Sequence, residues 1–297
     1  MIKKRREILF LYRVKDANPN GDPLNENQPR FDDDTGQALS SDVRIKRTVR
    51  DEWQREGRDV FVDGQSKSLS QKAQELAKKF PGADRASQLK HCIDVRAFGV
   101  VFALQKESLS WTGPVQFKWG RSLHRVRVVF VQGNSAFATK DDTNRSLRSE
   151  FIVPFALMGT SAIVNQAASK GTGMEESDVQ ALRDGLWNGT RNLVTRSKME
   201  HSPVLLLEIV YKEGVMNHLG SLDEKVRLVS PQGNPLGDDE QLALRSLQEC
   251  SLDFSEFNRS IQRVEEWIEE IRVVACPEVT FSQPPCWRGK ECDVQLR

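Results

Sequence analysis

The stretch REILFLYRVKDANPNGDP, residues 6–23, joins a strand pattern directly to a turn. Residues 6–14 are mostly apolar or strand-forming side chains, and such a run bounded by turn residues predicts a β-strand. The turn NPNGDP, residues 18–23, contains a glycine that supplies positive φ and two prolines that fix φ at about −65°. An ordinary turn accounts for this composition by itself. The polar residues that continue to position 40 predict a long loop, which in a compact domain is usually functional or disordered.

The loop leads to residues 41–55, whose pattern predicts an amphipathic helix. Ser40 or Ser41 can cap its first turn, where Asp42 also suits the helix dipole. At about 100° per residue, one stripe of this helix is apolar and consists of Ile45, Val49 and Trp53. Basic side chains gather on the opposite side, namely Lys46, Arg47 and Arg50. Val43 alone does not fit this division.

The rest of the chain reads as alternating short elements. We expect further helices over residues 66–80, 178–195 and 261–271, and further strands over residues 100–104, 114–119, 125–131 and 203–211. In strand 114–119, Val115, Phe117 and Trp119 share one face, and Gln116 and Lys118 share the other. Polar residues 132–150 predict an exposed hairpin or loop, and residues 276–297, rich in proline and cysteine, predict a flexible tail. This order predicts an α+β fold in one elaborated domain, residues 1–297.

Composition limits the classes of protein to which the chain can belong. The 297 residues are 38% hydrophobic and 29% charged, which is typical of a soluble chain with a core. Its 43 lysines and arginines nearly balance 42 acids, which argues against a protein that binds nucleic acid over its whole surface. A local basic track that contacts phosphates is still compatible with this balance. The apolar run at residues 8–12 is too short for a signal peptide or a membrane span. The five scattered cysteines fit neither a disulfide framework nor a zinc site, which favours a reduced, cytoplasmic protein.

Two acidic arrangements could hold a cation. Asn18, Asn20 and Asp22 alternate as calcium ligands do, but the glycine comes too early and a proline stands where a bidentate glutamate is needed. The calcium hypothesis therefore fails. Asp22 with Asp32-Asp33-Asp34 could bind magnesium in a metal-dependent nuclease, which is the alternative function. A solvated acidic turn explains these residues more simply, because three adjacent acids cannot all face one ion without strain.

The residue patterns of common catalytic and cofactor sites do not occur in this sequence. The four histidines have no partner at metal-ligand spacing, and the motifs G-x-S-x-G, H-E-x-x-H and G-x-x-x-x-G-K-[ST] are not found. We therefore expect no catalytic residue, no metal and no cofactor.

The basic helix is the better candidate for chemistry. Ser41 can donate to a phosphate, and a helix N-terminus favours anions, although a solvated basic face explains the same pattern. Arg96 and Arg121 are either further phosphate contacts or partners in structural ion pairs. The strands carry no aromatic motif for reading bases, so binding that follows the RNA backbone without regard to sequence is favoured over base recognition.

Three segments in order resemble one family. Asn18 to Pro23, Pro29-Arg30 and the helix of Ser41 to Arg50 are similar to the opening signature of the crRNA-backbone subunit of type I CRISPR Cascade complexes. The segment DVRAFG, residues 94–99, resembles the second block of that family, and TGPVQF with GRSLH, residues 112–117 and 120–124, resembles the third. The third block is most similar to the subtype I-B branch, with I-C as the near alternative. The resemblance spans residues 6 to about 211.

The resemblance implies an RRM-like (ferredoxin-like) palm with inserted subdomains and a thumb hairpin, placed by position at residues 132–150. It implies a non-catalytic scaffold in antiviral defence that polymerises along crRNA and presents it for pairing with target DNA, in contact with further copies of itself and other Cascade subunits. The RNA-binding residues that follow from this resemblance, together with the basic pattern, are Asn18, Asn20, Ser41, Arg44, Lys46, Arg47, Arg50, Arg96, Gln116, Lys118, Arg121, Phe137, Arg145, Leu147 and Arg148. Of these, Phe137 and Leu147 are candidates for the wedge at the kink of the guide, and Arg145 and Arg148 for phosphate contacts.

Overall fold

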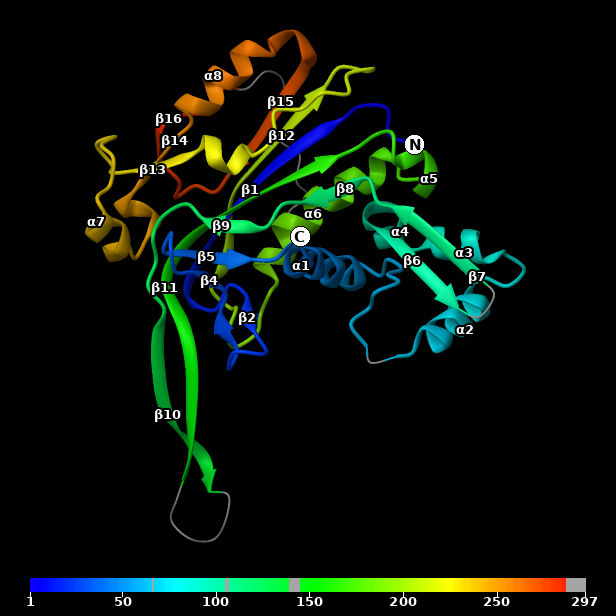
Figure 1. Ribbon diagram of the computed structural model, residues 1–297, viewed down its shortest axis with the longest axis horizontal. Helices are drawn as coiled ribbons and strands as arrows, with labels where there is room; N and C mark the ends of the chain where they lie inside the picture. Colours follow the sequence, from blue (N-terminus) through cyan, green and yellow to red (C-terminus); the bar gives the residue numbers. More distant parts are fainter. Residues whose placement is uncertain (66, 105–106, 139–144, 287–297) are drawn as a thin grey trace.

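The computed structural model describes residues 1–65, 67–104, 107–138 and 145–286, with the backbone alone at 134–138 and 145–148. Its centre, within that range, is a nine-stranded sheet in the order β15-β12-β1-β11-β9-β5-β4, with β8 and β10 also paired to β11 (Figure 1). The strands are β1 (Arg6–Ala17), β4 (Phe31–Asp32), β5 (Gln37–Ser40), β8 (Val115–Phe117), β9 (Gly120–Ser122), β10 (Val129–Ala138), β11 (Arg145–Val164), β12 (His201–Tyr211) and β15 (Ile268–Ala275). Every pair along this path is antiparallel. The predicted α+β class is confirmed.

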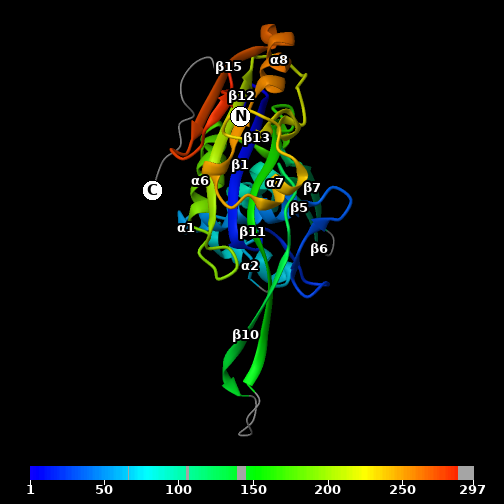
Figure 2. The same ribbon diagram turned by 90° about the vertical axis from the view of Figure 1, so that its left-hand side faces the viewer.

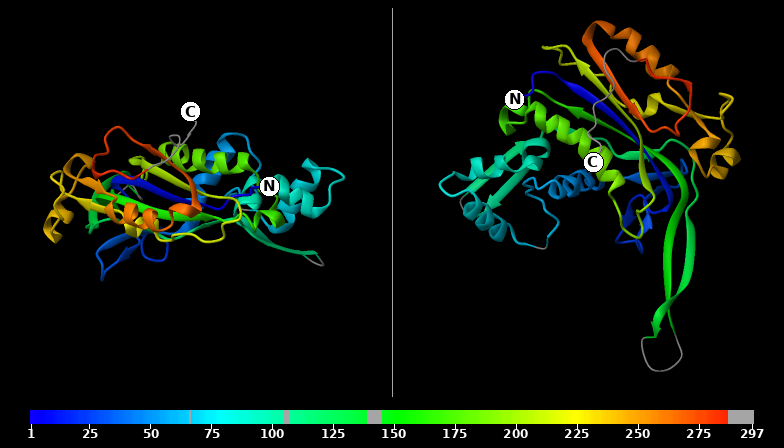
Figure 3. Two further views of the ribbon diagram at one scale, coloured as in Figure 1. Left: turned by 90° about the horizontal axis from the view of Figure 1, so that it is seen from above. Right: turned by 180° about the vertical axis from the view of Figure 1, so that it is seen from behind.

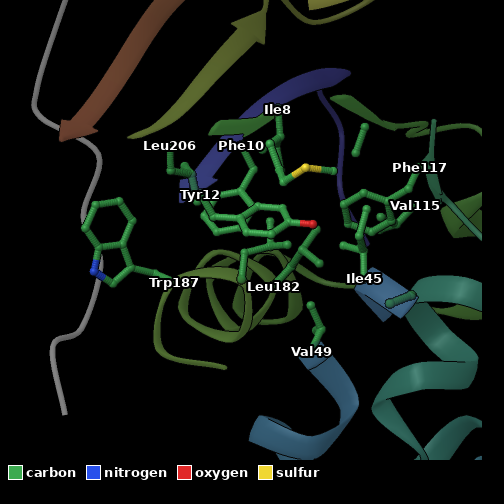
Figure 4. Packing of buried hydrophobic residues seen from close by; sticks show 14 of the residues in the cluster. Ile8, Phe10, Tyr12, Ile45, Val49, Val115, Phe117, Leu182, Trp187 and Leu206 are labelled. Atoms are coloured by element: carbon green, nitrogen blue, oxygen red, sulfur yellow. The ribbon is translucent and has the colours of Figure 1, made fainter. Parts of the chain in front are cut away.

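Two helices cover one face of this sheet, α1 (Asp42–Arg55) and α6 (Glu176–Arg191). Figure 4 shows Ile45 and Val49 of α1 and Leu182 of α6 directed towards Phe10 and Tyr12 of β1. The predicted apolar stripe of α1 is therefore confirmed. Val43, which did not fit it, is 65% exposed.

Helices α1 and α6 approach each other closely because α6 has two glycines on the side that meets α1. A Cβ at Gly185 would lie 2.9 Å from Val49 Cγ1, and one at Gly189 would lie 2.8 Å from the carbonyl oxygen of Thr48. Trp53 Nε1 also donates a 2.8 Å hydrogen bond to the Ala181 carbonyl. Backbone contact between the two helices therefore sets the position of α1, since interiors are close-packed.

The C-terminal third, in which the sequence shows no motif, covers the opposite face of the sheet (Figure 2). Its elements are η1 (Leu222–Lys225), β13 (Arg227–Val229), α7 (Asp238–Ala243), η2 (Leu247–Glu249), β14 (Ser251–Asp253), α8 (Ser255–Arg263), η3 (Glu265–Trp267) and β16 (Phe281–Gln283). Phe254, Phe257 and Ile261 pack with Leu9 and Leu11 of β1 in one cluster. Both faces of the central strands are thus buried, which explains the unbroken apolar runs at residues 8–12 of β1 and 203–207 of β12.

Residues between α1 and β8 form a separate small lobe, seen beside the sheet from above and behind in Figure 3. It contains α2 (Leu69–Lys79), α3 (Arg85–His91), α4 (Ile93–Phe98) and the hairpin of β6 (Gly99–Leu104) and β7 (Glu107–Thr112). It has its own core around Leu76, Leu89 and Phe102. The remaining short elements are β2 (Gly21–Asp22), β3 (Gln28–Pro29) and α5 (Ser169–Thr172). No helix in the described ranges is long and apolar enough to cross a membrane.

The lobe is joined to the sheet through two glycines of the motif segments. A Cβ on Gly113 would lie 2.0 Å from the carbonyl carbon of Phe98, and one on Gly99 would lie 2.2 Å from the Trp111 carbonyl oxygen. Gly99 also has a φ of +79°, which side-chain-bearing residues rarely adopt. The second and third sequence blocks are therefore in direct backbone contact.

Three sequence predictions were wrong in detail. The predicted helix 261–271 ends at Arg263, and β15 begins at Ile268, because Ile271 and the following valines pair with β12. The predicted strand 125–131 begins only at Val129, because the Val126 N–H donates to the Gly36 carbonyl instead of to a neighbouring strand. Trp119 is 46% exposed, since β8 ends at Phe117.

The segment 276–297, for which a flexible tail was expected, is partly paired. Strand β16 lies parallel to β14, with Leu252 opposite Phe281. Residues 287–297 lie outside the described residues.

A buried histidine of the third sequence block should make folding sensitive to acid. The Leu157 N–H donates to His124 Nε2 at 3.2 Å, so Nδ1 carries the proton and donates to the Arg125 carbonyl at 2.8 Å. Burial lowers the pKa of His124 from 6.5 to about 4. The unfolded chain therefore binds more protons at this residue than the folded one, so its contribution is complete above pH 6.5 and is lost as pH falls towards 4.

We predict that acid removes about 3 kcal/mol of unfolding free energy through His124. The measurement is a series of urea titrations between neutral pH and about pH 4, on the parent chain and on His124→Gln. Comparing the two at each pH removes the contribution of other groups. Equal slopes of stability against pH in both proteins would refute the role of His124.

Candidate nucleic-acid interface

The N-terminus of α1 is tied to the NPNGDP turn by one side chain. Asn20 Oδ1 accepts from both the backbone N–H of Ser41, at 2.8 Å, and its hydroxyl, at 3.0 Å. The Ser41 hydroxyl in turn accepts from the Arg44 N–H at 3.3 Å and so caps the helix. Asn18 is buried, and its Nδ2 donates to the Asn27 carbonyl at 2.7 Å. Asn20 therefore orients the start of α1, whereas Asn18 connects the turn to a later part of the same loop.

The basic face of α1 is lined by acids of the same chain. Lys46 pairs with Asp42 at 3.0 Å, and Arg47 pairs with Asp51. The charge on this face is therefore largely compensated, but these pairs are partly exposed. Partly exposed ion pairs contribute about 1 kcal/mol or less, so a phosphate can compete with the acids for the cations.

Arg50 links α1 to the small lobe. Its Nε lies 2.9 Å from Asp94 Oδ2, and Asp94 also accepts the backbone N–H groups of Phe61 and Val62 at 2.7 and 3.1 Å. The guanidinium also lies over the Phe98 ring, 5.0 Å from its centroid. Asp94 and Phe98 belong to the second sequence block, which therefore supports the basic face from one side.

Arg96 and Arg121 both form ion pairs within the chain, one of the two roles expected for them. Arg96 makes two hydrogen bonds to Asp178 of α6, at 2.9 and 2.7 Å. Arg121 Nη1 lies 2.7 Å from Asp32 Oδ2, and its hydrogen bond lowers the pKa of that carboxyl. These contacts join the lobe to α6, and β9 to the loop after β1.

The polar face of the third block points away from the core. Gln116 is exposed and donates to the Gly113 carbonyl at 2.9 Å. Lys118 Nζ lies 3.2 Å from Asp223 Oδ2 and also contacts Glu224. Lys118 therefore also connects the sheet to η1.

Strands β10 and β11 form a long hairpin that extends away from the sheet (Figures 1 and 2). At its base the rings of Phe130 and Phe151 lie 4.9 Å apart, and Phe130 is 48% exposed. The side chains of four predicted site residues on the hairpin lie outside the described residues: Phe137, Arg145, Leu147 and Arg148.

Two acids of the nuclease alternative, Asp22 and Asp32, are engaged by different arginines. Asp22 Oδ1 lies 3.3 Å from Arg30, and Asp32 is held by Arg121. The described residues contain no group of three or more His, Cys, Asp or Glu side chains that could hold a metal ion.

One residue of this region was missed by sequence reasoning. Lys198 precedes β12 and donates a 2.6 Å hydrogen bond to the Asn18 carbonyl, which places it beside the turn. No local pattern indicates this, because its position depends on the pairing of β1 with β12. A charged residue in a polar loop gives no signal of its own.

Comparison with known proteins gives consistent matches. The family model described as CRISPR-associated protein Cas7 matches residues 4–255. A CRISPR-associated protein Cas7 of Haloferax volcanii is 28% identical over 309 residues, covering 91% of this chain and 86% of that protein. Chains from two solved structures are also similar in shape. One, from a CRISPR RNA-guided surveillance complex, pre-nicking, has a TM-score of 0.49 and 13% identity, covering 95% of this chain and 96% of that one. Another, from a CRISPR RNA-guided surveillance complex, has a TM-score of 0.49 and 16% identity, covering 91% and 87%.

Proposed function

Because this chain belongs to the Cas7 family of CRISPR-associated proteins, we propose that it is a non-catalytic scaffold that binds crRNA in a CRISPR effector complex. The observation that carries this proposal is the basic face of α1. It lies opposite a buried stripe, and Asn20 of the first block and Asp94 of the second block contact α1 directly. Gly113 of the third block packs against the backbone of the second block. Cations fixed in this way suit the RNA backbone, whose phosphates position a strand without reading its sequence.

An RRM-like palm is supported by the arrangement of the central elements. The elements follow one another along the chain as in a β-α-β-β-α-β unit, in the order β1, α1, β9, β11, α6 and β12. In the sheet, the four strands have the spatial order of such a unit, β12-β1-β11-β9. We propose that the small lobe and the C-terminal third elaborate this one domain. We further propose that the hairpin of β10 and β11 is the thumb expected at residues 132–150.

The proposed partners follow from family membership and from charge. They are crRNA, target DNA through pairing with the guide, further copies of the chain and other Cascade subunits, in the cytoplasm. A net charge of +1 suits a polymer in which acids of one copy meet cations of the next.

The test is a salt titration of single-stranded RNA binding by the full chain. We expect Lys46→Ala with Arg50→Ala to lower the affinity and to reduce the salt slope by about one for each lost phosphate contact. Lys212→Ala, at the opposite end of β12 from α1, is the matched control. Because Arg50 also holds Asp94, thermal unfolding checks the fold, and Lys46→Ala alone separates the two effects.

Two outcomes would overturn this function. One is unchanged RNA binding by a folded double variant across the whole titration. The other is magnesium-dependent cleavage of RNA by the pure protein that disappears in Asp22→Ala.

A further inference from the structure

Two cations near the start of α1 differ from the rest of the basic face. Lys46, Arg47 and Arg50 each pair with a carboxylate, but Arg44 and Lys198 make no salt bridge with any described residue. Arg44 Nη1 donates instead to the Thr48 hydroxyl at 2.7 Å, and its buried Nε has no acceptor in the described chain. Lys198 Nζ donates to the Asn18 carbonyl. Both are half-buried, so each has lost some water without gaining a carboxylate within salt-bridge distance.

These two side chains influence each other electrostatically. Burial, followed by the charge of Arg44, lowers the pKa of Lys198 to about 7. Burial also lowers the pKa of Arg44. His201, at the start of β12, is the third basic group. Burial and the charges of Lys198 and Arg44 hold its pKa well below its ordinary value, so its ring is neutral.

The surroundings of this group indicate what it can bind. Arg44 comes from α1, His201 from β12, Tyr12 from β1 and the Asn18 carbonyl from the turn, and none of these four groups carries a negative charge at neutral pH. Arg47 and Asp51 of α1 also act on Arg44: the Asp51 carboxylate favours the charged form of Arg44, but it forms its ion pair with Arg47. The cavity beneath offers about 20 Å³, enough for one water but not for a base. Besides apolar side chains, its lining includes Tyr12, Ser40, Arg44, Thr48, Thr190 and His201. A ligand must therefore sit outside it and present an anion.

We propose that Arg44 and Lys198 together hold one phosphodiester group of single-stranded RNA beside the turn formed by residues 18–23. This inference rests on the proposed function and adds to it a contact from the segment between α6 and β12. Burial and the charge of Arg44 disfavour the charged form of Lys198 in the unbound protein, and a bound anion would restore that charge. A cation already paired with an acid must exchange one partner for another, so this pair gains more from a phosphate than Lys46 or Arg47 does.

The first test measures salt dependence with a single-stranded RNA oligonucleotide and the full chain. We expect Lys198→Gln to lower the salt slope by about one and Lys198→Arg to keep it. Lys212→Gln is the matched control, an exposed lysine that follows β12 as Lys198 precedes it. Unfolding of each variant is followed in urea. Below about pH 7, where Lys198 is charged, Lys198→Gln should be at least as stable as the parent, because it removes a charge that Arg44 repels.

The second test measures protons. A phosphate beside Lys198 restores its charge, so RNA binding at about pH 8 should take up about one proton, read from binding enthalpies in two buffers of different ionisation enthalpy. The uptake should disappear in Lys198→Gln.

The outcomes separate this inference from the proposed function. If the parent chain fails to bind RNA, both are wrong. A second case is that the parent binds RNA and that Lys46→Ala weakens this binding. If Lys198→Gln then leaves the salt slope and the proton uptake unchanged, only the proposed phosphate site is wrong. A destabilised Lys198→Gln with a parental salt slope would mean that Lys198 only supports the turn, which also overturns the inference.

Discussion

Replacing Glu208 with alanine is expected to remove about 3–5 kcal/mol of unfolding free energy. Glu208 lies on β12 with a side chain that is 0% exposed, and it faces three arginines. Arg183 of α6 contacts both carboxylate oxygens, at 3.1 and 2.9 Å. Arg6 of β1 and Arg272 of β15 each approach to 3.3 Å. Without the carboxylate, two nearly buried guanidinium groups lose a counter-ion.

Two further variants separate charge from packing. Glu208→Gln keeps the shape but not the charge, so it should also destabilise the chain, by less than alanine does. Adding Arg183→Met should recover part of the loss, since it removes one uncompensated charge, and a double-mutant cycle in urea measures the coupling. Additive losses for the two sites would contradict the network. A loss below about 1 kcal/mol for Glu208→Ala would do so as well.

The substitution Gly113→Ala is expected to cost about 3 kcal/mol, although it adds a single methyl group. The new Cβ would lie 2.0 Å from the Phe98 carbonyl carbon and 2.4 Å from the Gly99 nitrogen. Both neighbours are backbone atoms and cannot move aside alone. We therefore expect the small lobe to shift relative to the sheet, which also disturbs the contact of Arg50 with Phe98.

The matched control for Gly113 is Gly171→Ala. Its Cβ would meet only Trp111 Cδ1, at 3.8 Å, which is an ordinary contact. Urea midpoints of the two variants give the comparison. Similar stability of Gly113→Ala and Gly171→Ala would show that the backbone contact between the two sequence blocks is not needed for folding.

Local sequence pattern was sufficient to predict the elements that carry the candidate interface. The strand at β1, the helix α1 with its apolar stripe and the buried strand β12 follow from runs and periods that neighbouring residues define. The helix predicted over 261–271 failed because spacing at Ile261, Val264 and Ile268 suits both a helix and a bent chain. Strand pairing of β15 with β12 selects the bent chain over the helix, and a single sequence does not reveal which strands pair.

For the same reason, the sequence alone could not predict which acids pair with the basic residues. Arg50 meets Asp94 across 44 positions, and Arg96 meets Asp178 across 82. A basic face can be recognised from the helical spacing of its residues, but whether acids neutralise its charge depends on the tertiary fold. Charge counts therefore overstate how much free positive charge α1 offers, and they give no reason to single out Arg44 or Lys198.

The two glycines of α6 matter beyond the stability of one molecule. Because Gly185 and Gly189 let α1 rest on backbone rather than on long side chains, the helix has little freedom to roll or slide. If copies of this chain succeed one another along a guide, any tilt of α1 repeats in every copy and its effects add up with length. In such an assembly, the fixed position of α1 would keep the contacts of successive copies at a constant spacing along the strand.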